Sequence, residues 1–219
     1  MPLTPGALVF EENAQDYDRW FETDRGQALF ALELHCLKSV KRDLAGRWLE
    51  VGVGSGRFAQ ALQVGDGVDP APSMARLASA RGVDVTVGVG EHLPYANASF
   101  DGVLMVCTIC FVQDVAKVLS ECARVLAPGG HLLIGFVPLD SVWGQYHSSR
   151  GKAGHTYYAG ATFFLENDLV QLAKQAGLSV KQTAGCELPA PKSSPGDLTL
   201  DMRPTLGVPS FRAVLFYKE

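Results

Sequence analysis

A short apolar run followed by glycines at alternate positions constrains the fold more than any other part of this chain. Residues 47–56 read Arg-Trp-Leu-Glu-Val-Gly-Val-Gly-Ser-Gly. The apolar residues predict a buried strand, and the glycines allow a tight turn in which main chain can approach a ligand closely. A helix is expected to start near Ser55, so that free backbone N–H groups face outward beside the turn. Together these elements predict a site for a polar small molecule.

The glycine spacing separates this turn from two well-known phosphate-binding patterns. A dinucleotide-binding G-x-G-x-x-G pattern that began at Gly52 would need glycine at position 57, which is Arg57. The Gly-Lys-Ser/Thr ending of a phosphate-binding loop is also missing from this segment. What remains is E-x-G-x-G-x-G, formed by Glu50, Gly52, Gly54 and Gly56. The alternative is a glycine-rich turn that binds nothing.

Apolar strands and amphipathic helices alternate through most of the chain. The expected strands are 47–53, 66–69, 84–89, 101–107 and 131–137, and the expected helices between them are 55–63, 73–81 and 114–126. Such alternation predicts a parallel sheet with helices on both faces. Near the C-terminus a helix at 164–176 precedes strands 178–186 and 211–217, which have no helix between them and therefore form an antiparallel pair. The predicted fold is an α/β, Rossmann-like, doubly wound, seven-stranded mixed sheet.

Aromatic side chains stand out in the N-terminal segment. Asn13 is expected to cap a helix whose spacing places Tyr17, Trp20 and Phe21 on one face. A second helix is expected over 27–42, with an apolar side formed by Leu29, Leu32, Cys36 and Val40. The aromatic face indicates either a cover over a ligand or a simple anchor to the domain.

Composition limits the classes of function. The 219 residues suit one domain, and a net charge of −4 gives no support for a nucleic-acid footprint. The longest uncharged apolar stretch, Val103 to Val112, is far shorter than the roughly 20 residues that cross a bilayer. The N-terminus lacks the pattern of a secretory signal, and the five cysteines suit a reducing compartment. A cytoplasmic protein with a small-molecule acceptor, no nucleic-acid partner and no membrane partner is expected.

The E-x-G-x-G-x-G pattern resembles motif I of the class I S-adenosylmethionine-dependent methyltransferases. The resemblance runs from about residue 46 to the C-terminus and implies S-adenosyl-L-methionine as cofactor. It assigns Asp69 to the ribose hydroxyls and the apolar Met74 to the adenine. The segment Gly88-Val89-Gly90-Glu91 resembles a family segment that often carries an Asp in place of Val89. The full set of cofactor residues implied is Glu50, Gly52, Gly54, Gly56, Asp69, Pro70, Met74, Gly90, Glu91, Cys107 and Thr108.

A narrower likeness concerns the segment after the fourth expected strand. Thr-Ile-Cys-Phe-Val-Gln-Asp at 108–114, with Gly135 and later aromatic pairs, is similar to methyltransferase type 11 domains of unassigned acceptor. On this basis 1–45 forms an N-terminal helical cover, 46–137 the cofactor-binding half, and 138–219 the acceptor-side half. The last part contains a proline-rich excursion at 188–210. Aromatic cover and one thiol predict an acceptor site formed by Tyr17, Trp20, Phe21, Cys110, Tyr146, Tyr157 and Tyr158.

Methyl transfer needs positioning and exclusion of water more than a catalytic triad. A general base matters only for an acceptor that arrives protonated, and the weak candidates are His147, His155 and Asp140. Cys107 and Cys110 form C-x-x-C, but an extended strand would place them on opposite sides, and no metal site is expected. The predicted function is methylation of a small molecule. The alternatives are a quinone or lipid-like acceptor, and a catalytically silent cofactor-binding sensor or partner subunit.

Overall fold

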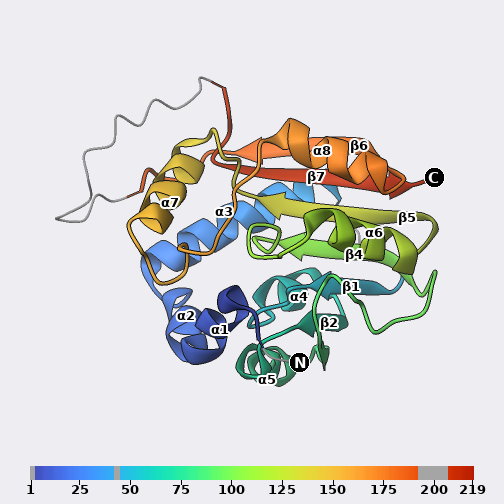
Figure 1. The fold of residues 1–219 in the computed structure, drawn as a ribbon, viewed down its shortest axis with the longest axis horizontal. Helices are drawn as coiled ribbons and strands as arrows, with labels where there is room; N and C mark the ends of the chain where they lie inside the picture. Colours follow the sequence, from blue (N-terminus) through green and yellow to red (C-terminus); the bar gives the residue numbers. More distant parts are fainter. Residues whose placement is uncertain (1–2, 42–44, 192–206) are drawn as a thin grey trace.

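One mixed sheet organises the computed structural model, which describes residues 3–41, 45–191 and 207–219. Its strand order is β3-β2-β1-β4-β5-β7-β6, as Figure 1 shows. Only the pairings of β7 are antiparallel. The predicted fold is therefore confirmed. The strands are β1 (Trp48–Val51), β2 (Asp66–Asp69), β3 (Asp84–Val87), β4 (Phe100–Val106), β5 (Leu126–Phe136), β6 (Leu178–Cys186) and β7 (Phe211–Lys218).

Helices cover both faces of the sheet. In the view of Figure 1, α6 and α8 lie in front of it and α3 runs behind it, while α1, α2 and α7 gather beyond the carboxyl ends of the parallel strands. Open α/β sheets bind their ligands at this edge. The helices are α1 (Pro5–Glu12), α2 (Ala14–Trp20), α3 (Asp24–Val40), α4 (Arg57–Leu62), α5 (Pro72–Ala80), α6 (Val115–Val125), α7 (Val142–Lys152) and α8 (Glu166–Gln175).

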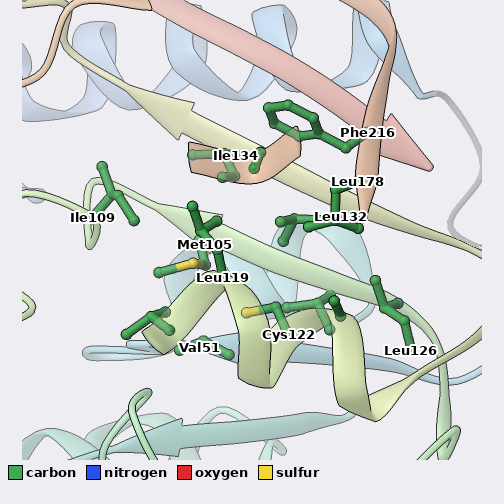
Figure 2. Packing of buried hydrophobic residues seen from close by; sticks show 14 of the residues in the cluster. Val51, Met105, Ile109, Leu119, Cys122, Leu126, Leu132, Ile134, Leu178 and Phe216 are labelled. Carbon is green, nitrogen blue, oxygen red and sulfur yellow. The ribbon is translucent and has the colours of Figure 1, made fainter. Parts of the chain in front are cut away.

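The core follows the two-residue period of the central strand. Val103 and Met105 of β4 belong to the apolar cluster under α6 and α8, while Leu104 and Val106 belong to the cluster under α3 and α4. Figure 2 shows the first cluster, in which Leu119 and Cys122 of α6 lie against β4 and β5. Both faces of β4 are buried, which explains its continuous apolar sequence.

The helix α6 begins and ends where local chemistry requires. Asp114 caps it, with Oδ1 accepting a hydrogen bond from the Lys117 backbone N–H at 2.9 Å, as the sequence predicts. Its end differs from the prediction, because β5 starts directly at Leu126 and includes Pro128-Gly129-Gly130. A register irregularity opposite Phe100 to Gly102 accommodates these residues.

Two helices of the structure, α1 and α7, were not predicted from the sequence. α1 starts at Pro5 after the capping residue Thr4, and the Asn13 amide donates to the Val9 carbonyl at 2.9 Å instead of capping α2. Asn13 thus closes α1 and also occupies the N-cap position of α2, as predicted, but its side chain makes no capping hydrogen bond to α2. α7 starts after Ser141, whose hydroxyl accepts from the Gly144 N–H at 3.0 Å. Both starts carry ordinary helix N-cap residues.

Other predicted bounds are close to those found, and some fall outside the described residues. Two predicted parts lie outside the described residues: position 42, at the end of the second expected helix, and 192–206 of the proline-rich excursion. Within the described ranges, no helix has both the length and the apolar character that a membrane crossing requires.

Candidate functional site

The carboxylate of Asp69 is held by backbone N–H groups at the end of β2. Oδ2 accepts from Gly54 at 2.8 Å and Oδ1 accepts from Ala71 at 2.9 Å. Burial raises the pKa of Asp69 to about 6, and the two backbone hydrogen bonds oppose that rise. Each oxygen has further acceptor capacity, and the residue lines a cavity of about 110 Å³. A fixed carboxylate of this kind suits a ligand with two adjacent hydroxyl groups.

Glycine occupies the three positions of the turn for different structural reasons. At Gly52 (φ +70°) a Cβ would lie 2.2 Å from the Thr108 methyl, and at Gly56 (φ +82°) it would lie 2.8 Å from Ala78. At Gly54 (φ +52°) a Cβ would meet nothing within 4 Å. Gly54 therefore leaves open space for a ligand. Gly56 does not line the 110 Å³ cavity, and its glycine is explained by packing against α5.

Glu50 has an unsatisfied oxygen beside the turn. The side chain is buried, and within the described part of the chain its Oε2 has no hydrogen-bond partner. Burial raises its pKa well above the usual range. Glu50 lines a second, larger cavity of about 600 Å³. An ammonium group placed there would satisfy the orphaned oxygen.

The smaller cavity brings together most of the predicted cofactor residues. Met74 is buried, and Thr108 donates to the Gly52 carbonyl at 3.1 Å. One Glu91 oxygen accepts from the Gln113 N–H at 2.8 Å, which fixes the turn after β4. The predicted members that line this cavity are Gly52, Gly54, Asp69, Pro70, Met74, Gly90, Glu91, Cys107 and Thr108. Val89, where the sequence departs from the family pattern, lines it too.

The larger cavity contains every residue of the predicted acceptor set. Its volume lies inside the range of about 300–1,000 Å³ that is usual for small-molecule sites. Tyr17, Trp20 and Phe21 come from the N-terminal segment, while Tyr146, Tyr157 and Tyr158 belong to α7 and the loop after it. Phe10 and Tyr17 line both cavities, so the two spaces share one wall.

Of the predicted bases, only the histidines lie at the larger cavity. Burial lowers the pKa of His147 to about 3, which makes it a poor proton acceptor at neutral pH. His147 is enclosed by rings, with its centroid 4.1 Å from that of Tyr158. His155 stacks on the same tyrosine at 5.0 Å. Asp140, in the described structure, lines neither cavity.

The two cysteines of C-x-x-C lie in a turn rather than in an extended strand, which corrects the expected geometry. Cys107 follows the last residue of β4 and has φ +52°, and the Cys110 thiol donates to its carbonyl at 3.6 Å. Both side chains line the larger cavity. Burial raises the pKa of Cys110 to about 12 and that of Cys107 well above its usual range, so both stay protonated at neutral pH.

Several cavity residues were missed by sequence reasoning, although each carried a signal. Arg150 belongs with Trp143, Tyr146 and His147 to one face of α7, at spacings of three and four. Glu33 lies four residues after Leu29 on the apolar side of α3, where a carboxyl group is out of place. An acidic residue inside an apolar stripe is a recognisable signal.

Ionic contacts fix the N-terminal wall to the sheet domain. The Glu11 carboxylate accepts from the Ser73 N–H at 2.7 Å and from its hydroxyl at 2.8 Å, at the start of α5. Asp18 of α2 pairs with Arg57 and Arg81, each at 2.8 Å. These contacts hold Phe10 and Tyr17 against the glycine turn.

A Rossmann-like sheet with an antiparallel β7, a glycine turn after β1 and a carboxylate after β2 defines the class I methyltransferase architecture. The family model described as "Methyltransferase domain" matches residues 49–134. A solved structure from Thermotoga maritima, an S-adenosylmethionine-dependent methyltransferase described as a possible histamine N-methyltransferase, is 32% identical with a TM-score of 0.82. The likeness covers 98% of this chain and 100% of that one. The chain belongs to the class I S-adenosylmethionine-dependent methyltransferases.

Similarity to curated proteins is more partial. An uncharacterized protein of Mycobacterium tuberculosis is 37% identical over 80% of this chain, and the match spans 62% of that protein's length. A ubiquinone biosynthesis O-methyltransferase of Xanthomonas oryzae is 30% identical over 53% of this chain and 55% of its own length. The chain thus spans less than two thirds of the curated relatives named here.

Proposed function

We propose that the protein transfers a methyl group from S-adenosylmethionine to a small molecule bound in the larger cavity. The observation that carries this proposal is that two cavities share lining residues at the glycine turn. The smaller one holds the Asp69 carboxylate, the larger one is walled by aromatic rings, and Gly52, Gly54 and Cys107 line both. A bipartite cofactor and an acceptor would meet at this junction.

The residues present fit the cofactor by their chemistry. Asp69 would accept hydrogen bonds from the ribose hydroxyls, because each of its oxygens keeps a lone pair beyond its backbone partner. The orphaned Glu50 oxygen would pair with the amino group of the methionine part. The open space at Gly54 admits the ligand between them. When bound, the cofactor supplies an activated methyl group attached to a sulfonium.

The chain's own contribution is enclosure and orientation. Aromatic rings from α1, α2, α7 and the 155–164 loop surround the larger cavity. Displacement of water and fixed orientation of the acceptor nucleophile supply most of the rate in such a reaction. The names of relatives leave the acceptor atom open, since the Thermotoga protein is described as a possible histamine N-methyltransferase and the Xanthomonas protein as an O-methyltransferase.

A quinone-like acceptor is a second candidate. It is supported by the similarity to the ubiquinone biosynthesis enzyme and by the apolar character of the cavity wall. Planar aromatic acceptors would stack against rings such as Tyr158 and Phe163.

Calorimetric titration with S-adenosylhomocysteine and S-adenosylmethionine tests the proposal first. Binding in the micromolar range is expected, and absence of binding to folded protein would overturn it. A screen with methyl-labelled cofactor against metabolite pools then follows. Transfer of label supports the enzyme, whereas binding without transfer to any pool supports the sensor alternative.

A further inference from the structure

Glu33 places a carboxyl group in the larger cavity, and this group is not assigned to the cofactor. It lies in α3 between Leu29 and Leu37, both buried, and lines the cavity. Among the described residues, no hydrogen bond or ion pair reaches its carboxyl group. Burial raises its pKa to about 8, with a smaller contribution from Cys36. A carboxyl group in such a place costs free energy unless a ligand satisfies it.

Four thiol and phenol groups near Glu33 are neutral. Tyr17 of α2, Cys107 after β4 and Tyr158 after α7 lie close enough for Glu33 to raise the pKa of each, although burial is the larger cause at all three. Cys186 at the end of β6 is also near, where the Cys36 thiol is the main cause of a raised pKa. Because the pKa of each of these four groups is raised, they stay protonated and neutral at pH 7. The pKa of the Cys36 thiol is lowered, chiefly by the Cys186 side chain.

The three arginines that line the cavity already have partners. Arg25 donates to the Ala190 carbonyl at 2.9 Å and lies 5.5 Å from the centre of the Trp143 ring. Arg150 donates to the Tyr146 hydroxyl at 2.8 Å, and its guanidinium lies over the Tyr146 ring. Arg57 pairs with Asp18 and Glu22. None of the three guanidinium groups forms a hydrogen bond or ion pair with Glu33 in the described structure. Glu33 is therefore left for a cation from outside.

Cys107 relates Glu33 to the cofactor side. Burial raises the pKa of its thiol, and the carboxyl groups of Glu33 and Glu50 both add to that rise. Glu33 of α3 and Glu50 of β1 thus both lie near this thiol, and all three residues line the larger cavity. A group bound at Glu33 would lie beside the junction of the two cavities, where the acceptor atom must be.

We propose that the larger cavity binds its acceptor as an ammonium ion, a primary or secondary amine on an apolar body, with Glu33 as ionic partner and the aromatic rings as walls. Aromatic faces attract cations, and a desolvated carboxylate completes the recognition. Glu33 then accepts the proton that must leave before nitrogen can act as a nucleophile. One N–H proton passes to a carboxylate oxygen, leaving a neutral amine with its lone pair and a neutral carboxyl group.

This proposal rests on the proposed function, because it takes the larger cavity to be the acceptor site. Its test needs no cofactor. Three probes share a phenyl body and differ in charge: phenethylamine, phenethyl alcohol and hydrocinnamate. Calorimetry at pH 7 is expected to show the amine binding roughly ten- to a hundredfold more tightly than the alcohol. Equal binding of amine and alcohol, preference for hydrocinnamate, or no binding of any probe would overturn the proposal.

Two variants separate the role of Glu33 from general effects. Glu33→Gln keeps the size of the side chain and is expected to reduce the preference for amine over alcohol to within about twofold, since the charge-assisted bond is lost. Glu12→Gln, at an exposed position of α1, is expected to retain the wild-type preference. A Glu33→Gln variant that keeps the full preference would contradict the assignment.

The number of protons released when the amine binds is a measurement that a merely structural role of Glu33 would not change. At pH 7 a carboxyl group with a pKa of about 8 is mostly protonated, so pairing with an ammonium ion releases about one proton in the wild type. Calorimetry in buffers of different ionisation enthalpy measures this number. It is expected to fall to about zero in Glu33→Gln, and release that persists in the variant would overturn the proposal.

The same protein samples are titrated with S-adenosylhomocysteine. If that ligand binds and the amine does not, the amine proposal fails while the proposed function stands. If the amine binds and S-adenosylhomocysteine does not, the proposed function fails instead. Unchanged S-adenosylhomocysteine binding in Glu33→Gln is also expected, because Glu50 and not Glu33 is assigned to the cofactor.

Discussion

The Gly54 backbone N–H donates a hydrogen bond to Oδ2 of Asp69 at 2.8 Å, so the glycine turn after β1 and the end of β2 form one unit. The same carboxylate accepts from Ala71 at the start of the next turn. Asp69 therefore shapes the site in addition to facing it. Substitutions at either residue are expected to act on cofactor binding before they act on the fold.

Replacement of Asp69 by Ala is expected to weaken S-adenosylhomocysteine binding by roughly 1.5–3 kcal/mol, about ten- to a hundredfold, because a charged acceptor for two hydroxyls is lost. Calorimetry measures the change. Asp66→Ala is the control, since Asp66 lies at the other end of β2 and pairs with Arg47. Equal losses in both variants would show that the effect comes from β2 in general.

Cofactor binding is expected to depend on pH through Asp69. Its pKa of about 6 means that the ionised acceptor is lost as pH falls below that value, so affinity falls with it. Stability without ligand changes in the opposite direction. Because the folded pKa is raised, this contribution is fully present below about 3.9 and is lost as pH rises through about 6. Asp69→Asn should flatten both profiles, which chemical denaturation and calorimetry across pH can measure.

Gly54→Ala is expected to lower cofactor affinity by at least about tenfold, because the new methyl group enters the open space of the turn. The left-handed backbone adds a strain of about 1 kcal/mol to the folded state. Gly82→Ala is a matched control, with φ +87° and open space around the Cβ, but at a site away from both cavities. The two variants are expected to lose similar stability, but only Gly54→Ala is expected to lose cofactor affinity. Equal cofactor affinities in the two variants would argue against ligand contact at Gly54.

Glu11→Ala is expected to loosen α1, since Ser73 loses two hydrogen bonds to a carboxylate. The cost in unfolding free energy is about 1–2 kcal/mol, and hydrogen exchange of the α1 amides should quicken. Cofactor affinity should fall as well, because α1 carries Phe10 into both cavities. Glu12→Ala, a change at the exposed neighbour, serves as control. Unchanged exchange in Glu11→Ala would mean that other contacts hold α1.

The sheet and the cofactor side could be predicted because their signals are local. Strand periodicity, glycines at alternate positions and a carboxylate at a strand end are each visible within about ten residues of sequence. The register irregularity in β5 was not visible, because it depends on the partner strand. Pro128 would ordinarily end a helix and delay the strand, but here it lies within the strand.

The acceptor side was predicted only in outline for a different reason. α7 has a cavity face that mixes Trp143 with His147 and Arg150, so it lacks the contrast between apolar and polar faces that reveals a helix. Its Gly144 packs against the backbone at Pro138, where a Cβ would lie 1.9 Å from the carbonyl oxygen. The presence of Glu33 and Tyr158 in one cavity likewise depends on segments more than a hundred residues apart.

The separation of α7 from the sheet has a consequence for the evolution of substrate range. Four side chains at positions 143, 146, 147 and 150 supply much of one acceptor wall, and none of them lines the smaller cavity of the described structure. Under the proposed function, mutations on this single helix are therefore expected to change which acceptor is bound while the smaller cavity stays intact. A library restricted to these positions would be a compact starting point for redirecting the enzyme to new acceptors.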